Sequence, residues 1–134
     1  MTMMTKEEAA AFAAQWLPAW TGNHPEKLAG FYSDDAFYLD PAIPRGVAGK
    51  AELLAYFRKL LAHNPDWVWT QIEGIPLEGG FLNKWLAKIP VGGRVLECFG
   101  VCLVQFNDHG LIRRNKVYFD RSELLHLIAQ QKKL

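Results

Sequence analysis

The sequence predicts an α+β fold in which helices pack on one side of a curved antiparallel sheet. In the first half of the chain, apolar residues recur at three- and four-residue spacing, which is typical of amphipathic helices. From Trp67 onward the pattern becomes strand-like, and Gly79-Gly80, Gly92-Gly93 and Asp108-His109-Gly110 separate the runs. The length of 134 residues suits one domain, so we expect a single domain over 1–134.

Three helices are expected in the first half of the chain, the third of them after a short strand that ends at Asp40. Thr5 and Glu8 form a capping-box pattern at the start of the first, whose apolar face continues to Trp20. Pro25 suits the first position of a short second helix, which would carry Leu28, Phe31 and Tyr32. The third helix is expected from Lys50 to His63, where Asn64-Pro65 would stop it.

Four strands and a last helix are expected in the second half of the chain. Three successive strand–turn–strand units predict an antiparallel meander. A helix over 121–131 would follow, with Asp120 or Ser122 as its cap. The expected strands are Trp67–Pro76, Phe81–Pro90, Arg94–Asn107 and Leu111–Phe119.

The stretch around Asp40 is the candidate for chemistry. Ser33-Asp34-Asp35 is typical of a turn, and Ala36–Leu39 is a short apolar run of strand type. Pro41 favours extended backbone at the residue before it, so Asp40 is expected at a strand end, followed by an irregular loop up to Gly49. A carboxylate in this position suits a general base. The alternative is a turn residue that accepts hydrogen bonds from loop N–H groups.

The composition restricts the possible partners and cofactors. Five Trp, eight Phe and four Tyr supply rings for a core or for a pocket that takes apolar ligands. Because 15 Lys and Arg nearly balance 14 Asp and Glu, nucleic acid is not expected as a partner. The four His lack metal-ligand spacing, and no nucleotide-binding motif occurs. We therefore expect no metal and no cofactor.

The sequence also predicts a cytoplasmic protein. No apolar segment follows Met1 as in a signal peptide, and no run approaches the ~20 residues that span a membrane. Cys98 and Cys102 lie four apart on a predicted strand, at about 13 Å by strand rise. A disulfide needs less than about 7 Å between the Cα atoms, so two reduced thiols are expected.

Several motifs resemble a known superfamily. They are Tyr32-Ser33-Asp34-Asp35-Ala36, Asp40-Pro41, Gly49-Lys50 with Leu53 and Tyr56-Phe57, and Phe106-Asn107-Asp108-His109-Gly110-Leu111-Ile112. With the order of elements, they make the chain similar to the nuclear transport factor 2-like superfamily. Its members include ketosteroid isomerases, SnoaL-like polyketide cyclases and limonene epoxide hydrolases. The resemblance covers nearly the whole chain and implies a cone-shaped fold.

The resemblance also implies roles for single residues. Asp40 falls on the position of the aspartate that moves a proton beside a ketone in ketosteroid isomerases. The positions of the two oxyanion donors of those enzymes carry Trp16 and Cys102. A supporting tyrosine position carries Phe57, whereas Tyr32 is retained. Trp16 keeps one N–H donor, so Asp40 and Trp16 are the candidate catalytic residues.

Strand parity predicts a pocket on one sheet face. With Cys102 inward, alternating positions place Asn83 and Trp85, and Asn115 and Phe119, on the same side. The opposite face, with Glu97, Arg114 and Tyr118 among its residues, is the one that forms homodimers in the superfamily. The residues expected to bind the ligand are Trp20, Tyr32, Phe57, Trp69, Asn83, Trp85, Cys102, Asn115 and Phe119.

Two classes of function remain open at this stage. In the first, the chain is a cofactor-free isomerase or cyclase that takes a small apolar carbonyl compound, with Asp40 as the base. This hypothesis needs a buried, unpaired Asp40. In the second, the chain is a non-catalytic ligand-binding or dimerisation module. The missing oxyanion donors favour the second class, and the retained Asp40-Pro41 favours the first.

Overall fold

The computed structural model describes residues 3–132, so the outermost residues of the predicted domain, 1–2 and 133–134, lie outside the described part. The helices are α1 (Lys6–Trp16), the 3-10 helix η1 (Leu17–Trp20), α2 (Pro25–Ala29), α3 (Lys50–His63) and α4 (Ser122–Lys132). The strands are β1 (Tyr32–Asp40), β2 (Ile43–Ala48), β3 (Val68–Leu77), β4 (Gly80–Val91), β5 (Arg94–Phe106) and β6 (Ile112–Tyr118).

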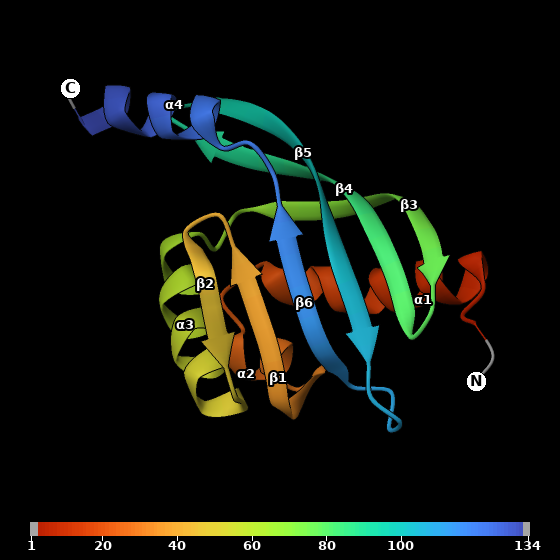
Figure 1. Cartoon of the computed structure of the whole chain (residues 1–134). Helices are drawn as coiled ribbons and strands as arrows, with labels where there is room; N and C mark the ends of the chain where they lie inside the picture. The colour runs from red at the N-terminus through yellow and green to blue at the C-terminus, as the bar shows by residue number, and fades with distance from the viewer. Residues whose placement is uncertain (1–2, 133–134) are drawn as a thin grey trace.

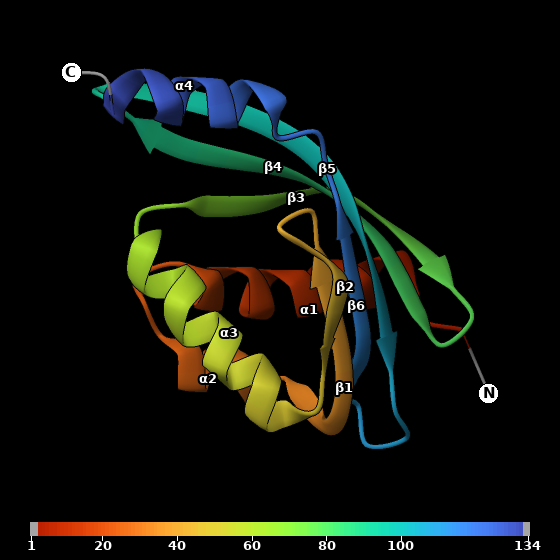
Figure 2. The same ribbon diagram turned by 60° about the vertical axis from the view of Figure 1, so that its left-hand side comes forward.

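The strands form one curved sheet of order β2-β1-β6-β5-β4-β3. β3 to β6 make the antiparallel meander that the glycine turns predict, and β1 adds to β6 in parallel. Figures 1 and 2 show α1, α2 and α3 on the concave side of the sheet, with α4 beyond them along the β4–β5 hairpin. This arrangement confirms the predicted α+β class.

The N-terminal helical segment begins and bends as its sequence indicates. The Thr5 hydroxyl accepts a hydrogen bond from the Glu8 backbone N–H, and the Glu8 carboxylate accepts one from the Thr5 N–H, both at 3.0 Å. Pro18 cannot donate a helical hydrogen bond, and α1 gives way to the 3-10 turn η1 after Trp16. The change of helix type places both Trp16 and Trp20 in the core.

Two predictions for the segment before α3 are wrong. Tyr32 is the first residue of β1 rather than part of the second helix, and Ser33-Asp34-Asp35 continues this strand instead of turning. Pairing of β1 with β6 at Tyr32 and from Phe37 to Leu39, on either side of an irregularity in register, overrides the local turn preference. The strand costs these polar residues little, because Asp34 and Asp35 are exposed and the buried Ser33 hydroxyl donates to Asp35 Oδ1 at 2.8 Å.

The loop expected after Asp40 also contains a strand, β2, which pairs with the end of β1. Gly46 makes this pairing possible. Its φ of 77° suits glycine, and a Cβ at this position would collide with the Phe37 ring. The hairpin holds Asp40 opposite Ile43, so the candidate base sits on an ordered turn.

The two faces of the meander follow the predicted parity. Cys98, Cys102 and Val104 of β5 are buried, whereas Glu97 and Phe99, the two neighbours of Cys98, are exposed. No helix between residues 3 and 132 combines the length and the apolarity that crossing a membrane requires.

Candidate functional site

A cavity of about 270 Å³ opens where the end of β1, the end of α3, the sheet and α4 meet. All five tryptophans of the chain line it. Among residues 3–132, the charged residues of its lining are Asp40 and Arg121. The lining comprises Trp16, Leu17, Trp20, Tyr38, Asp40, Pro41, Ala42, Tyr56, Leu60, Asn64, Trp67, Trp69, Trp85, Cys102, Val117, Phe119, Arg121, Leu124, Leu125 and Ile128.

The aromatic side chains form a continuous wall. The centroid of Trp69 lies 4.8 Å from that of Trp85 in an edge-to-face contact and 6.2 Å from that of Trp20. The Trp20 ring in turn lies 5.9 Å from Tyr38. Such pairs add about 0.5–1.5 kcal/mol each beyond the buried area, so the wall is held in place by its own contacts.

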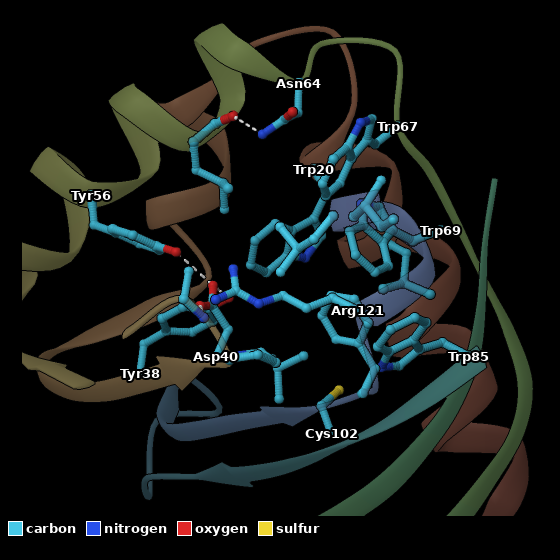
Figure 3. Close-up of a pocket in the computed structure, with 18 of the residues that line it drawn as sticks. Trp20, Tyr38, Asp40, Tyr56, Asn64, Trp67, Trp69, Trp85, Cys102 and Arg121 are labelled. Carbon is cyan, nitrogen blue, oxygen red and sulfur yellow. Dashed lines mark hydrogen bonds between the residues drawn. The ribbon is translucent and has the colours of Figure 1, made fainter. Parts of the chain in front are cut away.

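Asp40 ends β1 and is 7% exposed. Its Oδ2 accepts hydrogen bonds from the Tyr38 hydroxyl at 2.9 Å and from the Tyr56 hydroxyl at 2.7 Å (Figure 3). Its Oδ1 accepts the backbone N–H groups of Ala42 at 2.9 Å and Ile43 at 3.3 Å. Asp40 is therefore buried as expected but not unpaired, and its Oδ1 fills the alternative role of a turn acceptor.

Burial and the Asp40 charge both act on the two tyrosines. Burial is the larger effect and raises the pKa of Tyr38 well above its usual value, and the neighbouring Asp40 charge raises it further. The pKa of Tyr56 is raised by the same causes and lowered in part by the charge of Arg121. Both hydroxyls stay protonated at neutral pH and donate to Asp40.

A second cluster of polar side chains is buried next to the cavity, mostly outside its lining. The Tyr32 hydroxyl donates to Asn115 Oδ1 at 2.8 Å, and the Asn115 amide donates to the Leu103 carbonyl at 3.2 Å. Asn83 accepts from Gln71 at 2.9 Å and contacts Cys102 Sγ at 3.7 Å. Burial raises the pKa of the Cys102 thiol to about 12, so this thiol is neutral at physiological pH.

Trp16 keeps a donor free. It is 1% exposed, and its Nε1 has no hydrogen-bond partner among the described residues. The indole N–H lies close enough to the Tyr32 oxygen to lower the pKa of that hydroxyl slightly against the effect of burial, but its geometry is not that of a hydrogen bond. A buried donor without an acceptor costs free energy.

The structure brings only part of the predicted site to the cavity. The predicted residues that line it are Trp16, Trp20, Asp40, Trp69, Trp85, Cys102 and Phe119. Tyr32, Phe57, Asn83 and Asn115 are fully buried outside the lining.

The cavity also holds residues that the sequence reasoning did not select. Tyr38 could have been found, because it lies two positions before Asp40 and shares its strand face. Tyr56, Trp67 and Arg121 come from α3, from the segment before β3 and from the segment between β6 and α4. These three residues are far apart in the sequence, and only the tertiary structure brings them to one cavity.

Comparison with known proteins defines the family. The family model of the SnoaL-like domain matches residues 13–115, so the chain belongs to this family within the nuclear transport factor 2-like superfamily. No curated protein matches. The fold is similar to that of a hypothetical protein from Catenulispora acidiphila with a ketosteroid isomerase-like fold, solved in complex with trimethylamine. The TM-score is 0.75 and the identity 18%, over 87% of this chain and 91% of that one.

RV0760c from Mycobacterium tuberculosis is a second structure with a similar fold. The TM-score is 0.71 and the identity 22%, over 87% of this chain and 95% of that one. At these identities the likeness concerns the fold, and the chemistry of the cavity has to be argued from this chain's own residues.

Proposed function

We propose that this protein, as a single SnoaL-like domain, binds a small, mainly apolar organic molecule in the tryptophan-lined cavity. The observation that carries the proposal is that all five tryptophans line one cavity whose polar groups gather at Asp40. Ligand sites commonly combine an apolar wall with a few convergent polar groups. The trimethylamine complex of the Catenulispora acidiphila protein supports the view that this fold can hold a small organic molecule.

The volume limits the size of the ligand. A cavity of about 150 Å³ holds one benzene molecule, whereas this cavity measures about 270 Å³. Drug-sized pockets begin near 300 Å³. We therefore expect a ligand of one or two rings, or an aliphatic molecule of similar size, rather than a polycyclic compound.

A second candidate function is proton transfer with Asp40 as the base. The observation in its favour is that the cavity is lined both by Asp40 and by Trp16, whose indole N–H has no hydrogen-bond partner among the described residues. Asp40 would take a proton from the carbon beside a ketone and return it to another carbon, while Trp16 donates to the enolate oxygen. Because four donors occupy the Asp40 carboxylate, one tyrosine hydroxyl would have to move aside first.

The binding proposal is tested by filling the cavity. A thermal-shift screen of small ketones and lactones should raise the melting temperature of the wild type, since a ligand of the native state stabilises it by mass action. Val117 lines the cavity, so Val117→Phe should abolish these shifts. Val101 occupies the outer face of β5 opposite Tyr118, and Val101→Phe should leave them unchanged. Equal shifts in both variants would place binding elsewhere.

The ketones that bind in this screen also test whether Asp40 acts as a general base. If Asp40 moves protons, the wild type should accelerate deuterium exchange beside the ketone of a hit, and Asp40→Asn should lose this acceleration while retaining binding. Loss of general-base catalysis typically costs 10²–10⁴-fold in rate. Ketone binding without any exchange would leave the protein as a binding module.

We also propose that the outer sheet face mediates a homodimer and that the protein is cytoplasmic. Exposed Val95, Phe99 and Tyr118 on β5 and β6 support the first point, at 63%, 64% and 53% exposure. The free thiols of Cys98 and Cys102 support a reducing compartment. Light scattering should give twice the chain mass for the wild type and the monomer mass for Phe99→Glu. A monomeric wild type would rule the dimer out.

A further inference from the structure

The two charged side chains of the cavity, Asp40 and Arg121, differ in how many hydrogen bonds they make within the protein. The Asp40 carboxylate accepts four hydrogen bonds. The Arg121 side chain, which is partly buried, has no ion pair or hydrogen bond with any residue in the described part of the chain, and only its backbone carbonyl is engaged, by the Leu125 N–H at 2.9 Å. In Figure 3 its guanidinium group points into the cavity toward Asp40 and Tyr56. It therefore presents unused donors to the space where a ligand would lie.

Helix stability does not explain this arginine. Arg121 directly precedes α4, whose N-terminus carries the positive end of the helix dipole. A cation there is mildly unfavourable, and Asp120 already supplies the favourable charge by accepting hydrogen bonds from Ser122. Contact with a ligand in the cavity would explain why an arginine occupies position 121.

We propose that Arg121 sets the charge class of the ligand: it anchors a neutral molecule through an acceptor oxygen and excludes organic cations from the aromatic cavity. The proposal rests on the proposed binding function and specifies what that site accepts.

The anchoring half follows from the donors. A guanidinium group offers five N–H donors and no acceptor, so a carbonyl or ether oxygen is its natural partner in a ligand. In a cavity lined mostly by rings, water competes weakly, and hydrogen bonds from a charged donor are about twice as strong as those between neutral groups. A molecule of the same shape without oxygen would leave these donors unused.

The exclusion half follows from the charges. Tryptophan faces attract cations, and the Asp40 carboxylate at the same cavity would add to that attraction. The positive charge of Arg121 opposes the attraction of a cation to the tryptophan faces and to Asp40. Its electrostatic effect extends to the tyrosine that donates to Asp40, because it lowers the pKa of Tyr56 against the dominant effect of burial. With Arg121 present the lining carries one negative and one positive charge, so a neutral ligand is favoured over either ion.

Four probes of nearly one shape separate these contributions. They are acetophenone, which is neutral with an acceptor oxygen; α-methylstyrene, which lacks the oxygen; the benzamidine cation; and benzoate. Isothermal titration calorimetry at neutral pH would compare their affinities for the wild type, for Arg121→Met, and for Arg113→Met. Methionine keeps the packing of the arginine stem. Arg113 is exposed on β6 outside the cavity lining, so its variant matches the change of net charge.

We expect the wild type and Arg113→Met to bind acetophenone about tenfold or more tighter than the other three probes, on the scale of a hydrogen bond to a charged group. Arg121→Met should lose this preference and bind the benzamidine cation tightest. Unchanged acetophenone preference in Arg121→Met, or a wild type that favours the cation or benzoate, would overturn the role of Arg121 while leaving small-molecule binding intact. Failure of every probe to bind any variant would overturn both proposals.

Discussion

Replacing Asp40 by alanine is expected to lower the free energy of unfolding by about 3–5 kcal/mol. The substitution removes a carboxylate that accepts hydrogen bonds from Tyr38, Tyr56, Ala42 and Ile43. Tyr38 is 2% exposed, so its hydroxyl would remain buried without an acceptor. The loss of the two backbone bonds would also weaken the turn that leads into β2.

Two variants isolate the cause of this loss. Asp40→Asn keeps an acceptor for the turn and should cost less, about 1–2 kcal/mol, because the tyrosine hydroxyls would have to reorient toward an amide. Asp34→Ala removes a fully exposed carboxylate of the same strand, 4.0 Å from Lys50, and should change stability by less than about 0.5 kcal/mol. Urea unfolding of the three variants measures the differences. If Asp40→Ala were as stable as Asp34→Ala, the hydrogen bonds to Asp40 would contribute nothing.

The stability of the protein should fall steeply at alkaline pH. Burial raises the pKa of Cys102 to about 12 and the pKa values of the Tyr32 and Tyr38 hydroxyls well above their usual values. In the unfolded chain these groups lose their protons near about pH 8.5 and 10. The folded state thus holds protons that the unfolded state releases. The stabilisation is complete below about pH 8.5 and is lost as pH rises above that value.

The expected slope is about 1.4 kcal/mol per pH unit for each buried group once its unfolded form is ionised. Cysteine titrates first in the unfolded chain, and burial also raises the pKa of Cys98, so the double variant Cys98→Ala with Cys102→Ala should keep the free energy of unfolding nearly flat up to about pH 10. Urea unfolding from about pH 8 to about pH 11 tests both statements. A wild type whose stability did not change over that range would show that these groups ionise equally easily in the folded protein.

The fold could be predicted because its main signals are local. Glycine turns separate the strands of the meander, a capping box marks the start of α1, and Asn64-Pro65 marks the end of α3. The failures occur where tertiary pairing overrides local preference. Ser33-Asp34-Asp35 stays within a strand because β1 pairs with β6 on both sides of it, and β2 forms in a proline- and glycine-containing segment because β1 pairs with it.

The candidate site was predictable only along single elements. Strand parity placed Trp85 and Cys102 on the inner face, and the aspartate–proline pair identified Asp40. The hydrogen bond from Tyr56 spans 16 positions, and Arg121 reaches the cavity from the far end of the chain. No periodic pattern connects such residues, so the partners of Asp40 became visible only in three dimensions.

The central claim is that the tryptophan-lined cavity binds a small molecule. The most direct measurement is a nuclear magnetic resonance titration that follows the five indole N–H signals of the labelled protein as acetophenone is added. We expect the indole signals to shift together and to saturate, while the backbone amides of exposed Phe99 and Tyr118 on the outer face stay unchanged. Saturable shifts confined to the outer face, with unmoved indoles, would contradict the claim.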